Sequence, residues 1–349
     1  MFITDFSCIS PQRTYDQAFF GSNIKIHTGN RYAAIEPEYG SLIPAGLLRR
    51  MGKAVRMGVG TGLPLIQKNP DLDGIVLGTA NGGLEDCLKF LNQIVDYKEG
   101  TLTPTNFVQS TPNAIAGNLA LMSKNTGYNT THVHSGLAFE CALLDCMLLF
   151  NEKKAKSLLL GGIEEISEYN YNINYLGGSF KHENTSSHNL LHVDSPGTVC
   201  GEGAALFVVN SERSENTTAR ILDVDQISYP SLEDLISKTN HFLDSNGVLA
   251  QDIDTVILGY SGDNRNDFWY DKFHQEFFLH STIYSYKNLV GDYPTASAFA
   301  TWLAVQIILG KEIPSELLIS NPFVIQKPKN VLIYNHHKGE QHGFILLTA

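Results

Sequence analysis

The sequence predicts an α/β fold made of two related halves. Short runs rich in Val, Ile and Leu alternate with helix-like stretches, a pattern typical of buried strands. The segment "DLDGIVLGTANGG" at 71–83 also matches "DIDTVILGYSGDN" at 252–264, about half the chain further on. A strand and its Gly-rich turn that recur at such a distance indicate an internal duplication.

Four further pairs of segments occur in the same order in both halves. Residues 135–150 align with 295–310, which brings Ala138-Phe139 onto Ala298-Phe299 and predicts two long buried helices with small residues on one face. The remaining pairs are the strands 156–162 with 329–335, the final strands 203–210 with 342–349, and the helix-like segments 42–58 with 231–245 that precede the first repeat. The most polar stretch between strands is 211–219, so we divide the chain into halves at 1–215 and 216–349.

Composition narrows the classes of function. With 43% hydrophobic and 17% charged residues the chain can bury a substantial core, and its net charge of −11 argues against binding to nucleic acid or anionic membranes. No apolar stretch approaches the roughly 20 residues of a membrane span, and residues 1–16 do not resemble a signal peptide. The five cysteines are odd in number and form no CxxC pair, so we expect a cytoplasmic protein without disulfides, metal or cofactor.

The segment "NTTHVHSGLAFECALL" at 129–144 predicts a strand that enters an apolar helix through a tight Ser-Gly turn. Enzymes often place a nucleophile at such a turn, because the free N–H groups of the helix start stabilise negative charge. Here the candidate position is Val133, between His132 and His134. Valine cannot act as a nucleophile, so the turn is expected to have another purpose.

Five segments in the same order resemble the β-ketoacyl synthases of fatty acid and polyketide synthesis, over nearly the whole chain. They are "TPNAIAGNLALMSKNTGYNTTHVHSGLAFECALL", "AKSLLLGGIEE", "DSPGTVCGEGAALFVV", "GYSGDNRNDFWYDKF" and "YKNLVGDYPTASAFA". The resemblance implies the thiolase fold, two duplicated α/β halves in an α-β-α-β-α sandwich.

The family's chemistry uses a cysteine that takes the acyl chain and two histidines that assist decarboxylation and stabilise the oxyanion. Carried over by position, the cysteine falls on Val133, the first histidine on Ser261 and the second on Asp292, while Lys287 and Gly291 match the family. We therefore expect no catalytic residues of the family's kind in this chain.

The resemblance implies a chain-length-factor-like role, in which an inactive subunit pairs with a catalytic ketosynthase and receives the chain on an acyl carrier protein. Short pairs of this kind occur in aryl polyene and flexirubin-like pathways, the class that we favour. The dimer strand is expected at Thr130, Thr131, His132, Val133 and His134. In the family, the segment before this strand lines the partner's acyl tunnel, so Phe107, Val108 and Gln109 are candidates for the tunnel floor.

Two other readings stay open. One is an independent acyl-processing enzyme (acyltransferase, thioesterase or malonyl decarboxylase) with an altered site, in which His132 and His134 could join Ser261 and Asp292. The other is a homodimer that binds acyl groups without reacting. An ion pair between Lys287 and Asp292 is the simpler expectation for these two charges.

The remaining histidines and cysteines near these segments are expected to be structural. His336, His337 and His342 lack acidic or thiol companions, so we expect a solvated turn in a C-terminal hairpin rather than a metal site. Cys141 and Cys146 are expected to be buried, inert thiols, with Cys141 too deep in its helix to replace the missing nucleophile.

Overall fold

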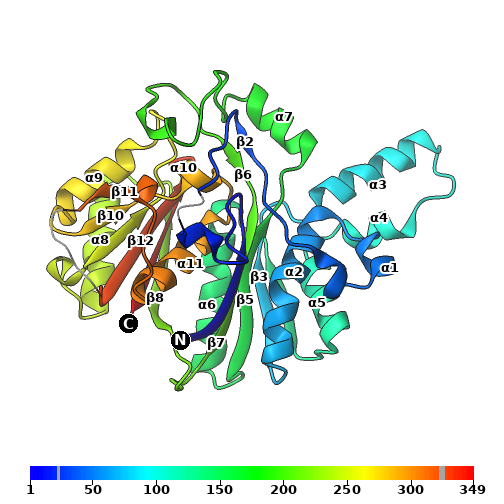
Figure 1. Cartoon of the computed structure of the whole chain (residues 1–349), viewed down its shortest axis with the longest axis horizontal. Helices are drawn as coiled ribbons and strands as arrows, with labels where there is room; N and C mark the ends of the chain where they lie inside the picture. The colour runs from blue at the N-terminus through cyan, green and yellow to red at the C-terminus, as the bar shows by residue number, and fades with distance from the viewer. Residues whose placement is uncertain (22–23, 322–326) are drawn as a thin grey trace.

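The computed structural model describes residues 1–21, 24–321 and 327–349. Within these residues, eleven strands form one continuous sheet in the order β11-β10-β9-β12-β13-β8-β1-β7-β5-β3-β4 (Figure 1). The strands are β1 (Phe2–Ile9), β3 (Gly74–Gly78), β4 (Tyr128–His132), β5 (Ser157–Glu164), β7 (Gly203–Asn210), β8 (Ala219–Ser228), β9 (Thr255–Leu258), β10 (Thr282–Tyr284), β11 (Leu318–Ser320), β12 (Asn330–His337) and β13 (Gln341–Thr348). The short strands β2 (Arg31–Tyr32) and β6 (Cys200–Gly201) pair separately.

Helices cover both faces of this sheet. The α-helices are α1 (Ala45–Leu48), α2 (Lys53–Lys68), α3 (Leu84–Asp96), α4 (Pro104–Gln109), α5 (Ala114–Ser123), α6 (Ala138–Asn151), α7 (Glu168–Leu176), α8 (Leu232–Ser245), α9 (Phe268–Phe277), α10 (Lys287–Val290) and α11 (Ala296–Ile308). The short 3-10 helices are η1 (Ala18–Phe20), η2 (Tyr39–Ser41), η3 (Ser135–Leu137), η4 (Leu190–His192), η5 (Ala250–Asp252) and η6 (Ser315–Leu317).

The two halves of the sheet have the same topology. β1, β7 and β5 pair antiparallel in turn, and β3 and β4 continue the row in parallel. β8, β13 and β12 repeat the antiparallel part, and β9 and β10 the parallel part. The predicted duplication is therefore confirmed, because the three aligned pairs of strands, β3 with β9, β5 with β12 and β7 with β13, fall in equivalent places of the sheet.

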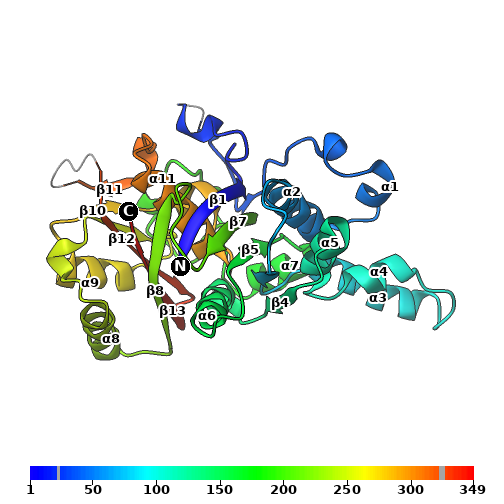
Figure 2. The same ribbon diagram turned by 90° about the horizontal axis from the view of Figure 1, so that it is seen from below.

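The helices α6 and α11 form the central layer. Both contact strands of the first half and strands of the second half, and Figure 2 shows them beside the strands of the two halves. Small residues allow this close approach: a Cβ on Gly162 would lie 2.8 Å from the Cβ of Ala298 on α11. α11 is buried on all sides, as its apolar sequence requires. α2 covers the outer face of the first half, and α8 and α9 cover that of the second. This is the predicted layered fold.

One predicted helix lies elsewhere. The segment 42–58 contains the short α1 and only the beginning of the long helix α2, which runs on from Lys53 to Lys68. Gly52 ends the gap between them, and a Cβ there would lie 1.9 Å from Oδ2 of Asp86, so this close contact fixes where α2 begins. The proposed division at 215/216 falls between β7 and β8. No helix in the described ranges is long and apolar enough to cross a membrane.

Candidate functional site

A pocket with a volume of about 580 Å³ lies where the two halves meet. Its walls come from the end of β5, from α7, from the loops after β9 and α10, and from the turn between β12 and β13. Ser261, Lys287 and Asp292 all line it. The fold thus brings together three of the positions that sequence comparison singled out.

The backbone fixes Asp292 in this pocket. Its N–H donates to the carbonyl of Val199 at 2.8 Å, and its carbonyl accepts from the N–H of Gly201 at 3.0 Å. The preceding Gly291 has a φ of 76°, and a Cβ there would lie 2.6 Å from the backbone of Gly201. Only glycine fits this conformation and contact without strain, so Gly291 sets the direction of the aspartate.

Lys287 and Asp292 form a largely buried ion pair, as expected, with Nζ 2.7 Å from Oδ1. The lysine side chain is 2% exposed, and its Nζ also donates to the carbonyl of His336 at 3.3 Å. A buried ammonium needs such a partner, since an uncompensated charge in the interior is strongly unfavourable. The lysine is therefore occupied by a carboxylate of the chain itself.

Ser261 is held by Asp267. The Asp267 carboxylate accepts hydrogen bonds from the backbone N–H of Ser261 and of Gly262, at 3.0 and 2.7 Å, and from the Ser261 hydroxyl at 3.1 Å. Burial raises the pKa of Asp267 to about 6, and these hydrogen bonds and the Lys287 charge oppose that rise. The serine hydroxyl is therefore already hydrogen-bonded within the protein, and unlike a histidine ring it cannot carry a positive charge.

Three more buried carboxylates surround the site. Glu164 accepts from the N–H of Asn81 at 3.1 Å and the hydroxyl of Thr79 at 3.0 Å, and Glu165 accepts from the N–H of Ala54 at 3.0 Å. Burial raises the pKa of Glu140, Glu164 and Glu165 to about 7 in each case. Glu164 and Glu165 line the pocket and Glu140 is buried within the range of the Lys287 charge, so the site is rich in acids, a feature that motif comparison alone did not reveal.

The turn after β4 presents a different residue to the pocket than expected. Val133 is 54% exposed and does not line the pocket, whereas Ser135 does. Ser135 has a φ of 48°, unusual for a residue other than glycine, and the N–H of Gly136 donates to Oε1 of Gln341 at 2.8 Å. Ser135 was missed because alignment alone does not show which residue of a strained turn faces inward.

His336 and His342 are buried, so the predicted solvated turn is wrong. His342 lies between the hydroxyl of Tyr334 at 2.8 Å and the carbonyl of Gly339 at 3.1 Å. His336 Nε2 contacts the carbonyl of Asn266 at 3.1 Å. Burial lowers the pKa of His337 and His342 to about 4. These rings belong to β12 and β13, where aromatic packing buries them, and the described residues include no group of three or more His, Cys, Asp or Glu suited to a metal.

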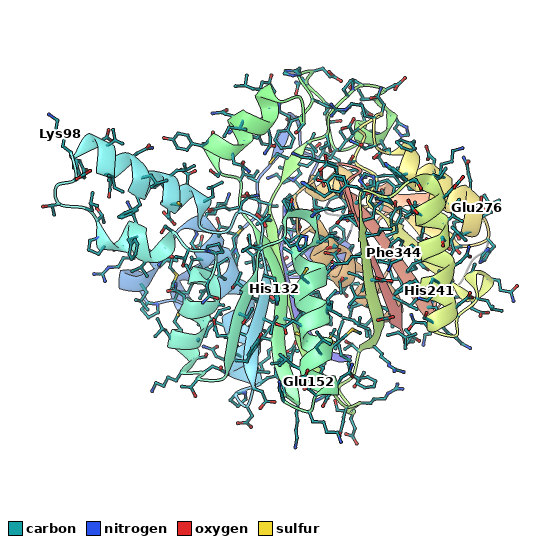
Figure 3. All side chains as sticks on the ribbon, turned by 180° about the vertical axis from the view of Figure 1, so that it is seen from behind. Lys98, His132, Glu152, His241, Glu276 and Phe344 are labelled. Atoms are coloured by element: carbon teal, nitrogen blue, oxygen red, sulfur yellow. The ribbon has the colours of Figure 1, made fainter. Side chains whose placement is uncertain are left out.

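The histidines beside Val133 lie outside the pocket. His132 Nε2 is 2.9 Å from Oδ2 of Asp145, and His134 Nδ1 is 3.5 Å from Sγ of Cys141 (Figure 3 labels His132). Neither ring joins Ser261 and Asp292. Cys146 is buried as expected, but Cys141 sits in the first turn of α6 and is only partly buried, so its expected depth is wrong. Burial raises the pKa of both thiols.

The expected dimer strand and tunnel residues lie on the outside of the chain. β4 is the last strand of the sheet, and Thr130 and Thr131 are partly exposed. The arm formed by α3 and α4 projects from the body, with Lys98 near its tip (Figure 3). On α4, Phe107 is 58% and Val108 60% exposed, while Gln109 is buried. None of the three residues lines the pocket between the two halves.

Comparison with known proteins agrees with this architecture. Residues 29–175 match the family model described as "Beta-ketoacyl synthase, N-terminal domain". A β-ketoacyl synthase from Burkholderia phymatum STM815 superposes with a TM-score of 0.79 at 15% identity, over 99% of this chain and 98% of that one. Residues 29–175 are therefore similar to the N-terminal domain of β-ketoacyl synthases, and the whole chain has the ketosynthase fold.

Two solved pairs are also similar. The ishigamide ketosynthase/chain length factor gives a TM-score of 0.78 at 14% identity, covering 100% of this chain and 98% of that one. The ketosynthase ApeO in complex with its chain length factor ApeC, from Xenorhabdus doucetiae, gives 0.75 at 15% identity, with 100% and 97% covered. A comparison with curated protein sequences gives no match.

Proposed function

We propose that this chain is a non-condensing, chain-length-factor-like subunit that pairs with an active ketosynthase during polyketide or fatty-acid-type chain elongation. The observation that carries the proposal is that the polar side chains of the pocket are already bound to other side chains of the same protein. Where the family places two histidines, this chain has Ser261, bound to Asp267, and Asp292, bound to Lys287.

These substitutions remove the chemistry of condensation. The turn above the pocket offers Val133 and Ser135 but no thiol, and Ser261 cannot supply a cation near neutral pH. An ionised Asp292 would repel an oxyanion that developed beside it. At an effective dielectric near 20, like charges about 4 Å apart cost roughly 4 kcal/mol. That is about a thousandfold in rate.

The free edge of the sheet supports the proposal that this chain pairs with a partner protein. β4 pairs with β3 on one side only, and an unpaired edge strand is a template for another chain. Apolar side chains are exposed around it, among them Tyr128 on β4 and Leu144 and Leu148 on α6. Exposed apolar side chains beside a free sheet edge are typical of a protein interface.

The arm of α3 and α4 would then reach the partner. Phe107 contacts Phe90 with ring centroids 5.3 Å apart, and much of its ring stays exposed in the single chain. In the proposed pair this surface is covered, and Phe107, Val108 and Gln109 shape the end of the partner's acyl tunnel. We place the pair in the aryl polyene or flexirubin-like class.

One observation favours the alternative of an independent acyl-processing enzyme. Ser135 has strained backbone geometry in a strand-to-helix turn and faces the pocket that His337 also lines. Nucleophilic serines occupy such turns in other enzymes. However, Ser135 has no hydrogen bond to His337 within the described residues, so the proposed non-condensing role explains more of the site.

Co-expression tests the proposal. With a ketosynthase encoded beside it, the chain should elute as a one-to-one complex, and mass spectrometry should find no acyl adduct on it after incubation with loaded carrier protein. Leu148→Lys should weaken the complex, whereas Leu249→Lys, an equally exposed leucine near α8, should not. A monomer that ignores such ketosynthases, or a stoichiometric acyl adduct on this chain, would contradict the proposal.

A further inference from the structure

Three cations line the pocket, and two of them are already paired with a carboxylate of the chain. Lys287 is 2.7 Å from Asp292. Arg265 makes two contacts to Asp263, Nε to Oδ1 at 2.9 Å and a terminal nitrogen to Oδ2 at 2.7 Å. The third cation, Lys338, is exposed and donates to Oδ1 of Asn174 at 3.2 Å. An incoming anion therefore finds no unpaired buried cation among the lining residues.

Asp292 cannot easily leave Lys287. Hydrogen bonds to Val199 and Gly201 hold the backbone of Asp292, and Gly291 fixes the direction in which the chain enters it. The aspartate thus occupies the place beside the ammonium that a ligand carboxylate would need. Glu164 and Glu165 add two more acidic side chains to the same lining. Because charges interact strongly in a partly desolvated site, the lining opposes a second anion.

Neutral groups make up much of the remaining wall. Ile166, Phe180 and Tyr293 offer apolar and aromatic surface, and Asn81 and Asn170 offer neutral hydrogen-bonding groups. The volume of about 580 Å³ is in the range of small-molecule sites. An uncharged acyl group with a thioester and amide arm matches this combination of apolar wall, neutral polar groups and internally compensated charge.

We infer that this pocket binds neutral acyl thioesters and rejects thioesters that carry a free carboxylate, with Asp292 setting the preference. The thioester ligand class rests on the proposed function, but the pocket would be a second acyl-binding site, separate from the partner's condensing site. The binding step involves no covalent change. Its specificity depends on whether Asp292 or a carboxylate of the ligand neutralises the charge of Lys287.

The test uses two probes of similar size, acetyl-pantetheine and malonyl-pantetheine, titrated calorimetrically into the purified full chain at pH 8. The acetyl probe should bind at least about tenfold more tightly than the malonyl probe. In Asp292→Asn, which frees the Lys287 charge, malonyl binding should tighten at least about tenfold, while acetyl binding changes less than about threefold.

Asp225→Asn is the matched control, because Asp225 forms an ion pair with Lys238 at the same 2.7 Å, away from the pocket. It should leave both affinities unchanged. Equal affinity of the wild-type chain for the two probes, tighter malonyl binding, or no binding of either would overturn the inference even if Asp292→Asn fails to fold. These results do not depend on a ketosynthase, so they are distinct from a failure to form the proposed pair.

Discussion

Ser261 gives both its backbone N–H and its hydroxyl to the carboxylate of Asp267, at 3.0 and 3.1 Å. The same carboxylate accepts from the N–H of Gly262. Asp267→Ala should lower the free energy of unfolding by about 3 kcal/mol, because it leaves three donors, two backbone N–H groups and the serine hydroxyl, without their acceptor. Ser261→Ala removes only the hydroxyl and should cost about 1 kcal/mol. Urea unfolding measures both, and equal effects would contradict this account of the loop.

The turn after β4 predicts a difference between two introduced thiols. Val133→Cys should be acylated only slowly by acyl-pantetheine, at the rate of an exposed thiol, because Val133 is not among the residues that line the pocket. Ser135→Cys lies at the pocket and should be acylated at least about tenfold faster, since proximity controls such reactions. Neither should condense, because Ser261 and Asp292 remain. Intact mass spectrometry over time gives the rates, and faster labelling at 133 would reverse the assignment.

We expect the buried His342 to make the folded protein less stable at acidic pH. Burial lowers its pKa to about 4 from an ordinary value of 6.5, so its contribution to stability is complete above pH 6.5 and is lost as the pH falls through 4. The stability difference between wild type and His342→Gln should therefore shrink by about 3 kcal/mol between pH 7 and pH 4.

Glu140, Glu164 and Glu165 act in the opposite direction, since their pKa values are raised to about 7. Their penalty develops as the pH rises through 7, so only a comparison of variants isolates the histidine. Tyr334→Phe removes the hydroxyl beside His342 and keeps the ring, so it should keep the wild-type pH dependence. A pH-independent difference for His342→Gln, measured by urea unfolding, would refute the assignment.

Phe107 predicts a change in product length. Because its ring is more than half exposed in the single chain, Phe107→Ala should cost only about 1 kcal/mol of stability, below the 3–5 kcal/mol of a fully buried ring. In the assembled pair, alanine should lengthen products by one or more two-carbon units, and tryptophan should shorten them. Chromatography of released products measures both.

Leu279→Ala, at an equally exposed apolar residue of the other half, controls for nonspecific effects. If both Phe107 variants only reduce the yield of complex and leave the length distribution unchanged, Phe107 is an ordinary interface residue.

The architecture could be predicted from the sequence because the duplication presents the pattern of each strand and helix twice. The strand at 74–78 and its copy at 255–258 support each other, and the Ala-Phe pairs of α6 and α11 fix the register of the central layer. The start of α2 was missed because it depends on the contact between Gly52 and Asp86, which are far apart in sequence.

The site was predicted only in part. The motif positions of Ser261, Lys287 and Asp292 were enough to place them together, and all three line the pocket. Each follows a strand or helix whose order in the fold the resemblance implies. The inward position of Ser135 and the burial of His336 and His342 depend on a left-handed turn and on aromatic stacking across a hairpin. Neither leaves a periodic pattern in the sequence.

The position of β1 in the middle of the sheet has a consequence for synthesis. Phe2 pairs with Asn210 and also with Arg220, so β1 leaves the ribosome well before its partners, which emerge more than 200 residues later. At 5–20 residues per second, it stays unpaired for roughly 10–40 s. During that interval its apolar residues are free to meet other nascent chains or chaperones. Protein yield in the cell is therefore expected to depend on translation speed between β1 and β8.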